Sequence, residues 1–154
     1  MLVLLVALAL AGHSGSQGTS SFVVDDAGAV AVRIELAEAD LPDLCGVDLA
    51  HGDVSLQEAR LARAVARGLP AWVVLTADGA RRCAMQGAAH TRLGGGVVRL
   101  SATAVCTDAR DLPATPHTLQ VDWGLFAGTP LDHVSVARFV RQRTTIESGV
   151  AICR

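Results

Sequence analysis

The chain has 154 residues, the size of one domain with a substantial hydrophobic core. It is 51% hydrophobic but only 3% aromatic, and 13 Lys and Arg residues against 15 Asp and Glu residues give a net charge of −2. Because it contains no block of basic residues, the sequence argues against nucleic acid and anionic membranes as partners.

An unbroken apolar run, MLVLLVALALAG, occupies residues 1–12. It is shorter than the roughly 20 residues that a helix needs to span a bilayer. Its length fits the apolar region of a secretory signal, and Ala9-Leu10-Ala11 supplies the small residues of a cleavage site. A positively charged start is absent, so either the true start lies upstream or the signal is atypical; a buried first strand is the alternative. We therefore expect a signal peptide over residues 1–12 and an exported protein, periplasmic or extracellular.

The polar segment over residues 13–21, HSGSQGTSS, predicts a flexible start to the mature chain. If cleavage follows Gly12, His13 becomes the N-terminal residue and carries an amine and an imidazole together. Such a pair of nitrogens can bind copper or nickel. The alternative is a flexible polar end without a ligand.

Residues 22–154 are predicted to form a single domain. A short strand over residues 22–25 and a turn over residues 26–28 come first. Apolar and polar side chains then alternate with the period of a half-buried strand. The apolar positions of this strand are Val30, Val32, Ile34 and Leu36. Leu41-Pro42-Asp43 ends the pattern.

Residues 47–58, VDLAHGDVSLQE, resemble an EF-hand calcium loop that has lost half of its ligands. Gly52, Ser55 and Glu58 occupy positions 6, 9 and 12, which need a sharp turn, a ligand and a bidentate ligand. Positions 1, 3 and 5, which should supply oxygen ligands, are Val47, Leu49 and His51. We interpret the segment as a turn that caps the next helix, with Ser55 and Glu58 as the remaining candidate metal ligands.

One helix is predicted over residues 55–69, after the second strand. Ser55 is the expected N-cap, and Glu58 completes a capping box. One face of the helix is apolar and carries Val54, Leu61, Ala62, Val65 and Leu69. The opposite face carries Arg60, Arg63 and Arg67. We interpret this row as solvated surface, with a binding role as the alternative; Gly68 and Pro70 are expected to end the helix.

After residue 70 the sequence predicts short strands separated by turns. Apolar or alternating segments cover residues 71–76, 83–86, 97–106, 119–125, 134–140 and 144–152. Asp78-Gly79 predicts a hairpin turn, and residues 94–96, all Gly, a loop. The whole pattern predicts a mainly β fold, an antiparallel Ig-like β-sandwich of about seven strands with the single inserted helix.

Four cysteines follow the apolar start, and they are Cys45, Cys83, Cys106 and Cys153. An even number in an exported chain suggests disulfide bonds, with three possible connectivities. No two cysteines have the C-x-x-C spacing of a structural zinc site or a thioredoxin-like redox pair.

Several motifs follow one another in a characteristic order. The degenerate calcium loop precedes an Arg- and Ala-rich helix, and an Asp-Gly hairpin precedes Cys83 and a strand that ends in Cys106. Residues 119–126 (LQVDWGLF) and 130–133 (PLDH) come next. This order resembles the N-terminal extracytoplasmic domain of HupE/UreJ-like membrane proteins, over roughly residues 13–140. The sequence departs from that family in its missing calcium carboxylates and in carrying no transmembrane helices before Arg154.

The resemblance implies a disulfide between Cys83 and Cys106, because the family has a cysteine at both places and both lie at the ends of adjacent predicted strands. Cys45 and Cys153 are then the possible second pair, by elimination. His133 falls in the family's Asp-Pro-x-His segment. We expect it to orient a loop through a hydrogen bond, with metal ligation as the alternative.

The function that the resemblance implies is a non-enzymatic, exported accessory or interaction domain of a HupE/UreJ-like membrane protein. Its partner would be a membrane protein or the membrane-embedded part of the same system. The alternative is a periplasmic domain that binds or senses Ni, Cu or Ca. The sequence has no closely spaced His pair and no catalytic constellation, so we expect no enzymatic activity and no cofactor. Neither nucleic-acid binding nor direct membrane insertion after signal removal is expected.

Overall fold

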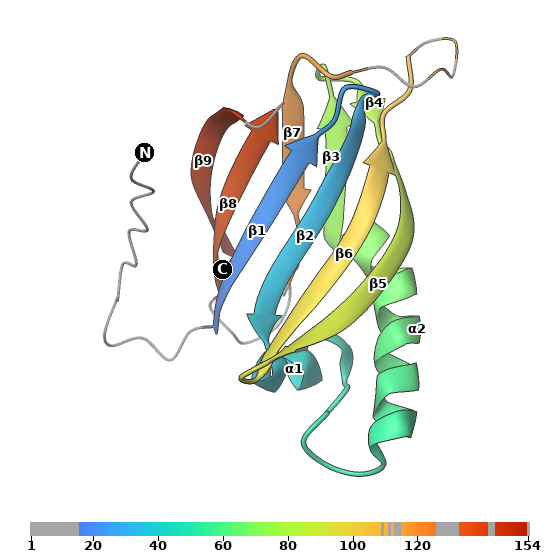
Figure 1. The fold of residues 1–154 in the computed structure, drawn as a ribbon, viewed down its shortest axis with the longest axis vertical. Helices are drawn as coiled ribbons and strands as arrows, with labels where there is room; N and C mark the ends of the chain where they lie inside the picture. The colour runs from blue at the N-terminus through green and yellow to red at the C-terminus, as the bar shows by residue number, and fades with distance from the viewer. Residues whose placement is uncertain are drawn as a thin grey trace.

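Two packed β-sheets and one long helix make up the fold (Figure 1). The computed structural model describes residues 16–108, 110, 112, 115–125, 133–141 and 144–153, with side chains for those between 18 and 125. In chain order, the elements are β1 (Ser16–Val24), β2 (Ala29–Ala37), the 3-10 helix η1 (Glu38–Asp40), α1 (Leu41–Cys45), α2 (Val54–Trp72), β3 (Val73–Ala77), β4 (Arg81–Arg82), β5 (Ala84–Gly94), β6 (Val97–Val105), β7 (Leu119–Trp123), β8 (His133–Arg141) and β9 (Thr144–Cys153). The predicted mainly β sandwich with an inserted helix is confirmed.

The larger sheet has the strand order β5-β6-β2-β1-β8-β9, and the smaller sheet has the order β4-β3-β7. Alternation in the sequence determines which side of each strand is buried. In β2, the side chains of Val30, Val32, Ile34 and Leu36 are all buried. They lie opposite the alternating apolar residues of β6, with Ile34 paired to Leu100. These two strands therefore present one continuous apolar face to the smaller sheet.

The first strand begins earlier than the sequence suggested. Residues 16–21, predicted to be a flexible start, belong to β1, which pairs antiparallel with β2 and parallel with β8. A strand with neighbours on both sides has its backbone groups satisfied, which overrides the polar composition of this segment. The β1–β8 pair is the one parallel pair among the described strands, so the larger sheet is mixed rather than wholly antiparallel.

The edge strand β5 is irregular. Its pairing with β6 shifts register between Gln86 and Ala89 and again between Arg92 and Gly94, and Gly87 has a φ of +63°. The helix α2 packs beside this strand (Figure 1). Bulges and a covering helix both protect an edge from pairing with another chain.

The helix α2 differs from its prediction at both ends. The N-cap is Asp53, whose Oδ1 accepts the Leu56 N–H at 2.9 Å, and not Ser55. Val54, expected to be buried, is 53% exposed because the first turn extends beyond the sheets. The helix continues through Gly68 and Pro70 to Trp72.

Gly68 has a packing role rather than a terminating one. A Cβ at this position would overlap the indole ring of Trp72. Pro70 lies in the last turn, where the missing N–H removes only one hydrogen bond. As predicted, the apolar face of α2 buries Leu61, Val65 and Leu69.

The disulfide between Cys83 and Cys106 forms as predicted. Cys83 connects β4 to β5, and its N–H donates to the Leu75 carbonyl of β3 at 2.8 Å. Cys106 directly follows β6. Because Ala84 pairs with Val105, the bond joins the start of β5 to the end of β6, at the point where the chain passes from the smaller sheet to the larger one.

The three alternating residues of β7, Leu119, Val121 and Trp123, are half-buried rather than fully buried. They face the core from a strand that ends the smaller sheet, where fewer side chains cover them. Among the described residues, no helix combines the length and apolar character needed to cross a membrane.

Candidate functional site

The segment that resembles a calcium loop folds around the core instead of around an ion. Gly52 has a φ of +89°, as expected for the sharp turn of position 6. Val47 and Leu49, however, are 3% and 7% exposed and belong to the hydrophobic core. Two of the positions that should carry oxygen ligands are thus apolar anchors that hold the loop to the sheets.

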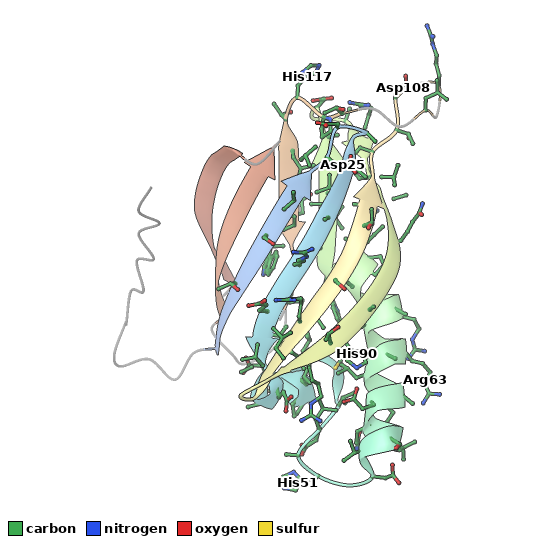
Figure 2. The ribbon with its side chains drawn as sticks, viewed as in Figure 1. Asp25, His51, Arg63, His90, Asp108 and His117 are labelled. Atoms are coloured by element: carbon green, nitrogen blue, oxygen red, sulfur yellow. A yellow bond between two sulfur atoms is a disulfide. The ribbon has the colours of Figure 1, made fainter. Side chains whose placement is uncertain are left out.

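The Asp48 side chain takes its hydrogen-bond partners from within this loop. Asp48 accepts the Ala50 N–H through Oδ1 at 2.9 Å and the His51 Nδ1–H through Oδ2 at 2.7 Å. The hydrogen bond from His51 lowers the pKa of the Asp48 carboxyl below its usual range. The His51 side chain lies at the tip of the loop (Figure 2) and is 83% exposed.

Glu58, predicted as a capping residue and as a candidate ligand, instead joins α2 to β5. Its Oε2 accepts the His90 Nε2–H at 2.6 Å, and its Oε1 lies 3.7 Å from Arg92 Nη1. His90 is 12% exposed and Glu58 is 31% exposed, so the pair is partly shielded from water. The expected capping bond from Glu58 to the Ser55 backbone is wrong, because the helix already begins at Val54 and the carboxylate binds His90 of β5.

Arg92 extends this contact to η1, which directly follows β2. Its Nε and Nη2 donate to the two carboxylate oxygens of Glu38 at 2.6 and 2.9 Å. This bidentate hydrogen bond with Glu38 raises the pKa of the Arg92 guanidinium above its ordinary value. The four side chains Glu38, Glu58, His90 and Arg92 form a network that fixes η1, β5 and α2 relative to one another.

Sequence reasoning missed His90 as a partner of Glu58. The two residues are 32 positions apart, and neither belongs to a motif that names the other. The only signal was the position of Glu58 on the side of the helix that carries Leu61 and Val65, where a carboxylate needs a partner.

The other predicted site residues are not brought together. Ser55 is exposed on the first turn of α2. Cys45 has a free thiol, so the predicted Cys45–Cys153 pairing is not formed. The thiol donates to the Leu41 carbonyl at 3.3 Å, and burial raises the pKa of the thiol. His133 and Cys153 lie opposite each other in the β8–β9 register, with side chains outside the described residues, as is all of His13. Within the described part of the chain, no three His, Cys, Asp or Glu side chains are placed to hold a metal ion.

The outward face of α2 carries three arginines at helical spacing. Arg60, Arg63 and Arg67, here called the arginine row, are all exposed. Figure 2 shows Arg63 projecting from the side of the helix that faces away from the strands. None of the three has an ion-pair partner among the residues that the structure describes, in contrast to Arg81, Arg92 and Arg99. The arginine row is therefore free to contact another molecule.

A pocket of about 310 Å³ lies beside the last turn of α2. It is lined mainly by apolar residues of β3 and β5, together with Pro70 and the disulfide residue Cys83. Arg82 supplies its one charged side chain. Its volume is at the small end for a ligand pocket.

No family model and no curated protein matches this chain.

Proposed function

We propose that this chain is an exported, non-enzymatic interaction domain, an accessory module of a membrane system of the HupE/UreJ-like kind. Its partner is a membrane protein or the membrane-embedded part of the same system, and it binds to the outward face of α2. The observation that carries this proposal is the arginine row, three exposed guanidinium groups without a partner in the described part of the chain.

Several other charged groups are used within the fold. Glu58, His90, Arg92 and Glu38 hold elements together, and Glu35 pairs with Arg99 on the outer face of the larger sheet. These groups are committed to the fold. The arginine row has no such use among the described residues. Unlike the exposed Arg33, Arg82 and Arg110, its three guanidinium groups share one face of one helix, which makes them available together to an external partner.

Two features support export. The Cys83–Cys106 disulfide is compatible with an oxidising compartment, where such bonds persist. The apolar segment over residues 1–12 has the pattern of a secretory signal. The periplasm or the cell exterior is the proposed location.

Site-specific photo-crosslinking tests the proposed surface. A photoreactive residue replaces Ala66, which is exposed beside the arginine row, and in a control it replaces Thr103, which is exposed on the larger sheet. We expect a discrete crosslink to one membrane protein from position 66 and none from position 103, in cells that naturally export the domain. Equal labelling from both positions, or none from either, would contradict the proposal.

Metal binding is the competing function and is measured separately. We expect calorimetric titration with Ca²⁺, Ni²⁺ and Cu²⁺ to give no stoichiometric binding. A tight site for any of the three would instead support a metal-binding or metal-sensing domain.

A further inference from the structure

The arginine row follows the spacing of a helix-packing seam. Leu56, Arg60, Arg63 and Arg67 are separated by four, three and four residues, so all four lie along one line of α2. With a rise of 1.5 Å per residue, the three guanidinium groups extend over about 10 Å. Ala59 and Ala66 border this line and are exposed. Their short side chains leave room for a second helix at the usual interaxial distance of about 8–10 Å.

No carboxylate neutralises this seam within α2. Neither Arg60, Arg63 nor Arg67 has an acidic residue three or four positions away, and they are instead neighbours of one another. The nearest acids along the chain are committed elsewhere, since Asp53 caps the helix and Glu58 binds His90. A partner that covers the seam must therefore bring its own negative charge.

Two further features restrict the chemistry of the partner: the cations are arginines, and the first turn of α2 exposes apolar side chains. Arginine presents a planar fork that matches a carboxylate in a bidentate way. Val54 and Leu56, 53% and 48% exposed, offer an apolar contact at the first turn. Beyond that turn the outward face carries only Arg and Ala, so it lacks the apolar stripe with which a helix inserts into a membrane surface.

We propose that the partner binds the arginine row through an acidic α-helical segment, with carboxylates that match the spacing of the three arginines and an apolar residue facing Leu56. This inference rests on the proposed interaction function and specifies the chemistry of its partner.

Two peptides of identical composition and about 18 residues, long enough to form a helix, test the inference with the full-length protein. In the first peptide, one Leu and three Glu are separated by four, three and four residues, as Leu56 and the three arginines are in α2. The second peptide contains the same residues, but its three Glu are distributed around the helix instead of lying on one face. We expect the first peptide to bind about tenfold more tightly in fluorescence anisotropy, and to lose that preference as salt increases.

Charge reversal gives the matched comparison. The variant Arg63→Glu/Arg67→Glu should no longer bind the first peptide. It should instead bind a third peptide, in which Lys replaces the three Glu residues of the first. The control Arg33→Glu/Arg110→Glu makes the same change of net charge at two exposed arginines away from α2 and should bind like the unmodified protein. Circular dichroism establishes that both variants fold.

Three outcomes would overturn the inference: equal binding of the two peptides, an equal loss in both variants, or binding to phosphatidylglycerol vesicles without a preference between peptides. If the peptides fail while the crosslink from position 66 persists, the interaction surface stands and the acidic helix is wrong. If both fail, the proposed function falls with it.

Discussion

At the scale of single residues, Asp78 organises one end of the sandwich. Its Oδ1 accepts the backbone N–H groups of His117 and Thr118, each at 2.9 Å, and its Oδ2 accepts from Arg81. Arg81 in turn donates to the Thr107 carbonyl at 3.0 Å. Asp78 itself has a φ of +50°, a conformation that a short polar side chain tolerates in a turn. One carboxylate thus joins the β3–β4 turn to the segment that enters β7.

The pKa of Asp78 makes this contact sensitive to acid. The hydrogen bond from the Thr118 N–H is the main cause that lowers the pKa of the Asp78 carboxyl below its ordinary value of 3.8. A carboxyl group whose pKa is lower in the folded than in the unfolded protein stabilises the fold at pH values above its unfolded-state pKa. That stabilisation is lost as the pH falls through the folded-state pKa. We expect Asp78→Asn to lower the melting temperature at pH 7 and to flatten its decline between about pH 5 and pH 2.

Thermal unfolding at several pH values checks this prediction. Asp43→Asn, which removes an exposed carboxylate of α1, is the control and should retain the decline of the unmodified protein. Parallel curves for Asp78→Asn and the unmodified protein would show that the turn contributes nothing to acid sensitivity.

The sequence predicted part of this residue-level detail. Asp78-Gly79 was identifiable as a hairpin turn, and Gly52 as a sharp turn, because both depend on local backbone chemistry. The hydrogen bonds from residues 117 and 118 to Asp78 join segments about 40 positions apart, and a local sequence pattern cannot predict such bonds. The Glu58–His90 pair could not be predicted for the same reason.

At the scale of elements, the attachment of α2 to β5 combines an apolar face with one partly shielded hydrogen-bonded pair, Glu58 and His90. Removing His90 leaves the Glu58 carboxylate with a weaker partner at a position that is 31% exposed. We expect a double-mutant cycle with Glu58→Gln and His90→Gln to give a coupling energy of about 1 kcal/mol. The Glu35–Arg99 pair, whose side chains are 36% and 38% exposed, serves as the control and should couple by less than about 0.5 kcal/mol.

Urea unfolding measures both cycles. Equal coupling in the two pairs would mean that the partial burial of His90 adds nothing to the interaction. A coupling energy near zero for Glu58 and His90 would mean that the apolar face alone attaches the helix.

The arginine row has a cost for the helix that carries it. Arg63 is three and four positions from two other arginines, and such like-charge neighbours each destabilise a helix by about 0.2–0.5 kcal/mol. Replacing Arg63 by Glu converts both repulsions into attractions. We expect Arg63→Glu to raise the free energy of unfolding by about 1 kcal/mol while weakening partner binding. A destabilised Arg63→Glu protein would contradict the view that the row is kept for binding.

Periodicity predicted the helix better than its ends. Leu61, Val65 and Leu69 were assigned to the core from their spacing alone, and they are buried. The predicted cap was wrong because Asp53, two residues before Ser55, accepts the Leu56 N–H and starts the helix at Val54, so that Ser55 already lies inside the first turn. The predicted burial of Val54 was wrong, because residue spacing places a side chain on a helix face but does not show where the sheet under that face ends.

At the scale of the whole molecule, alternation predicted a sandwich but not its strand order. β2 and β6 were identifiable because each has one buried side. The parallel pairing of β1 with β8 joins residues 16–24 to residues 133–141, and strand patterns do not specify such distant neighbours. The disulfide was predictable because a family resemblance supplied the pairing that spacing left open.

The Cys83–Cys106 bond closes a separation of 23 residues and joins the start of β5 to the end of β6. In the chain-entropy model, a loop of this length stabilises the fold by about 3 kcal/mol. We expect Cys83→Ala/Cys106→Ala to lower the unfolding free energy by this amount in urea titrations, with Cys45→Ala as a control that costs about 1 kcal/mol or less. A double variant as stable as the unmodified protein would remove the disulfide from the account of this fold.

The most direct test of the central claim, that the outward face of α2 binds a partner through its arginines, is the crosslink yield from position 66 in charge-reversed backgrounds. The account predicts at least about a tenfold loss of yield with Arg63→Glu/Arg67→Glu and no loss with Arg33→Glu/Arg110→Glu. An unchanged yield in the first background, or an equal loss in both, would contradict it.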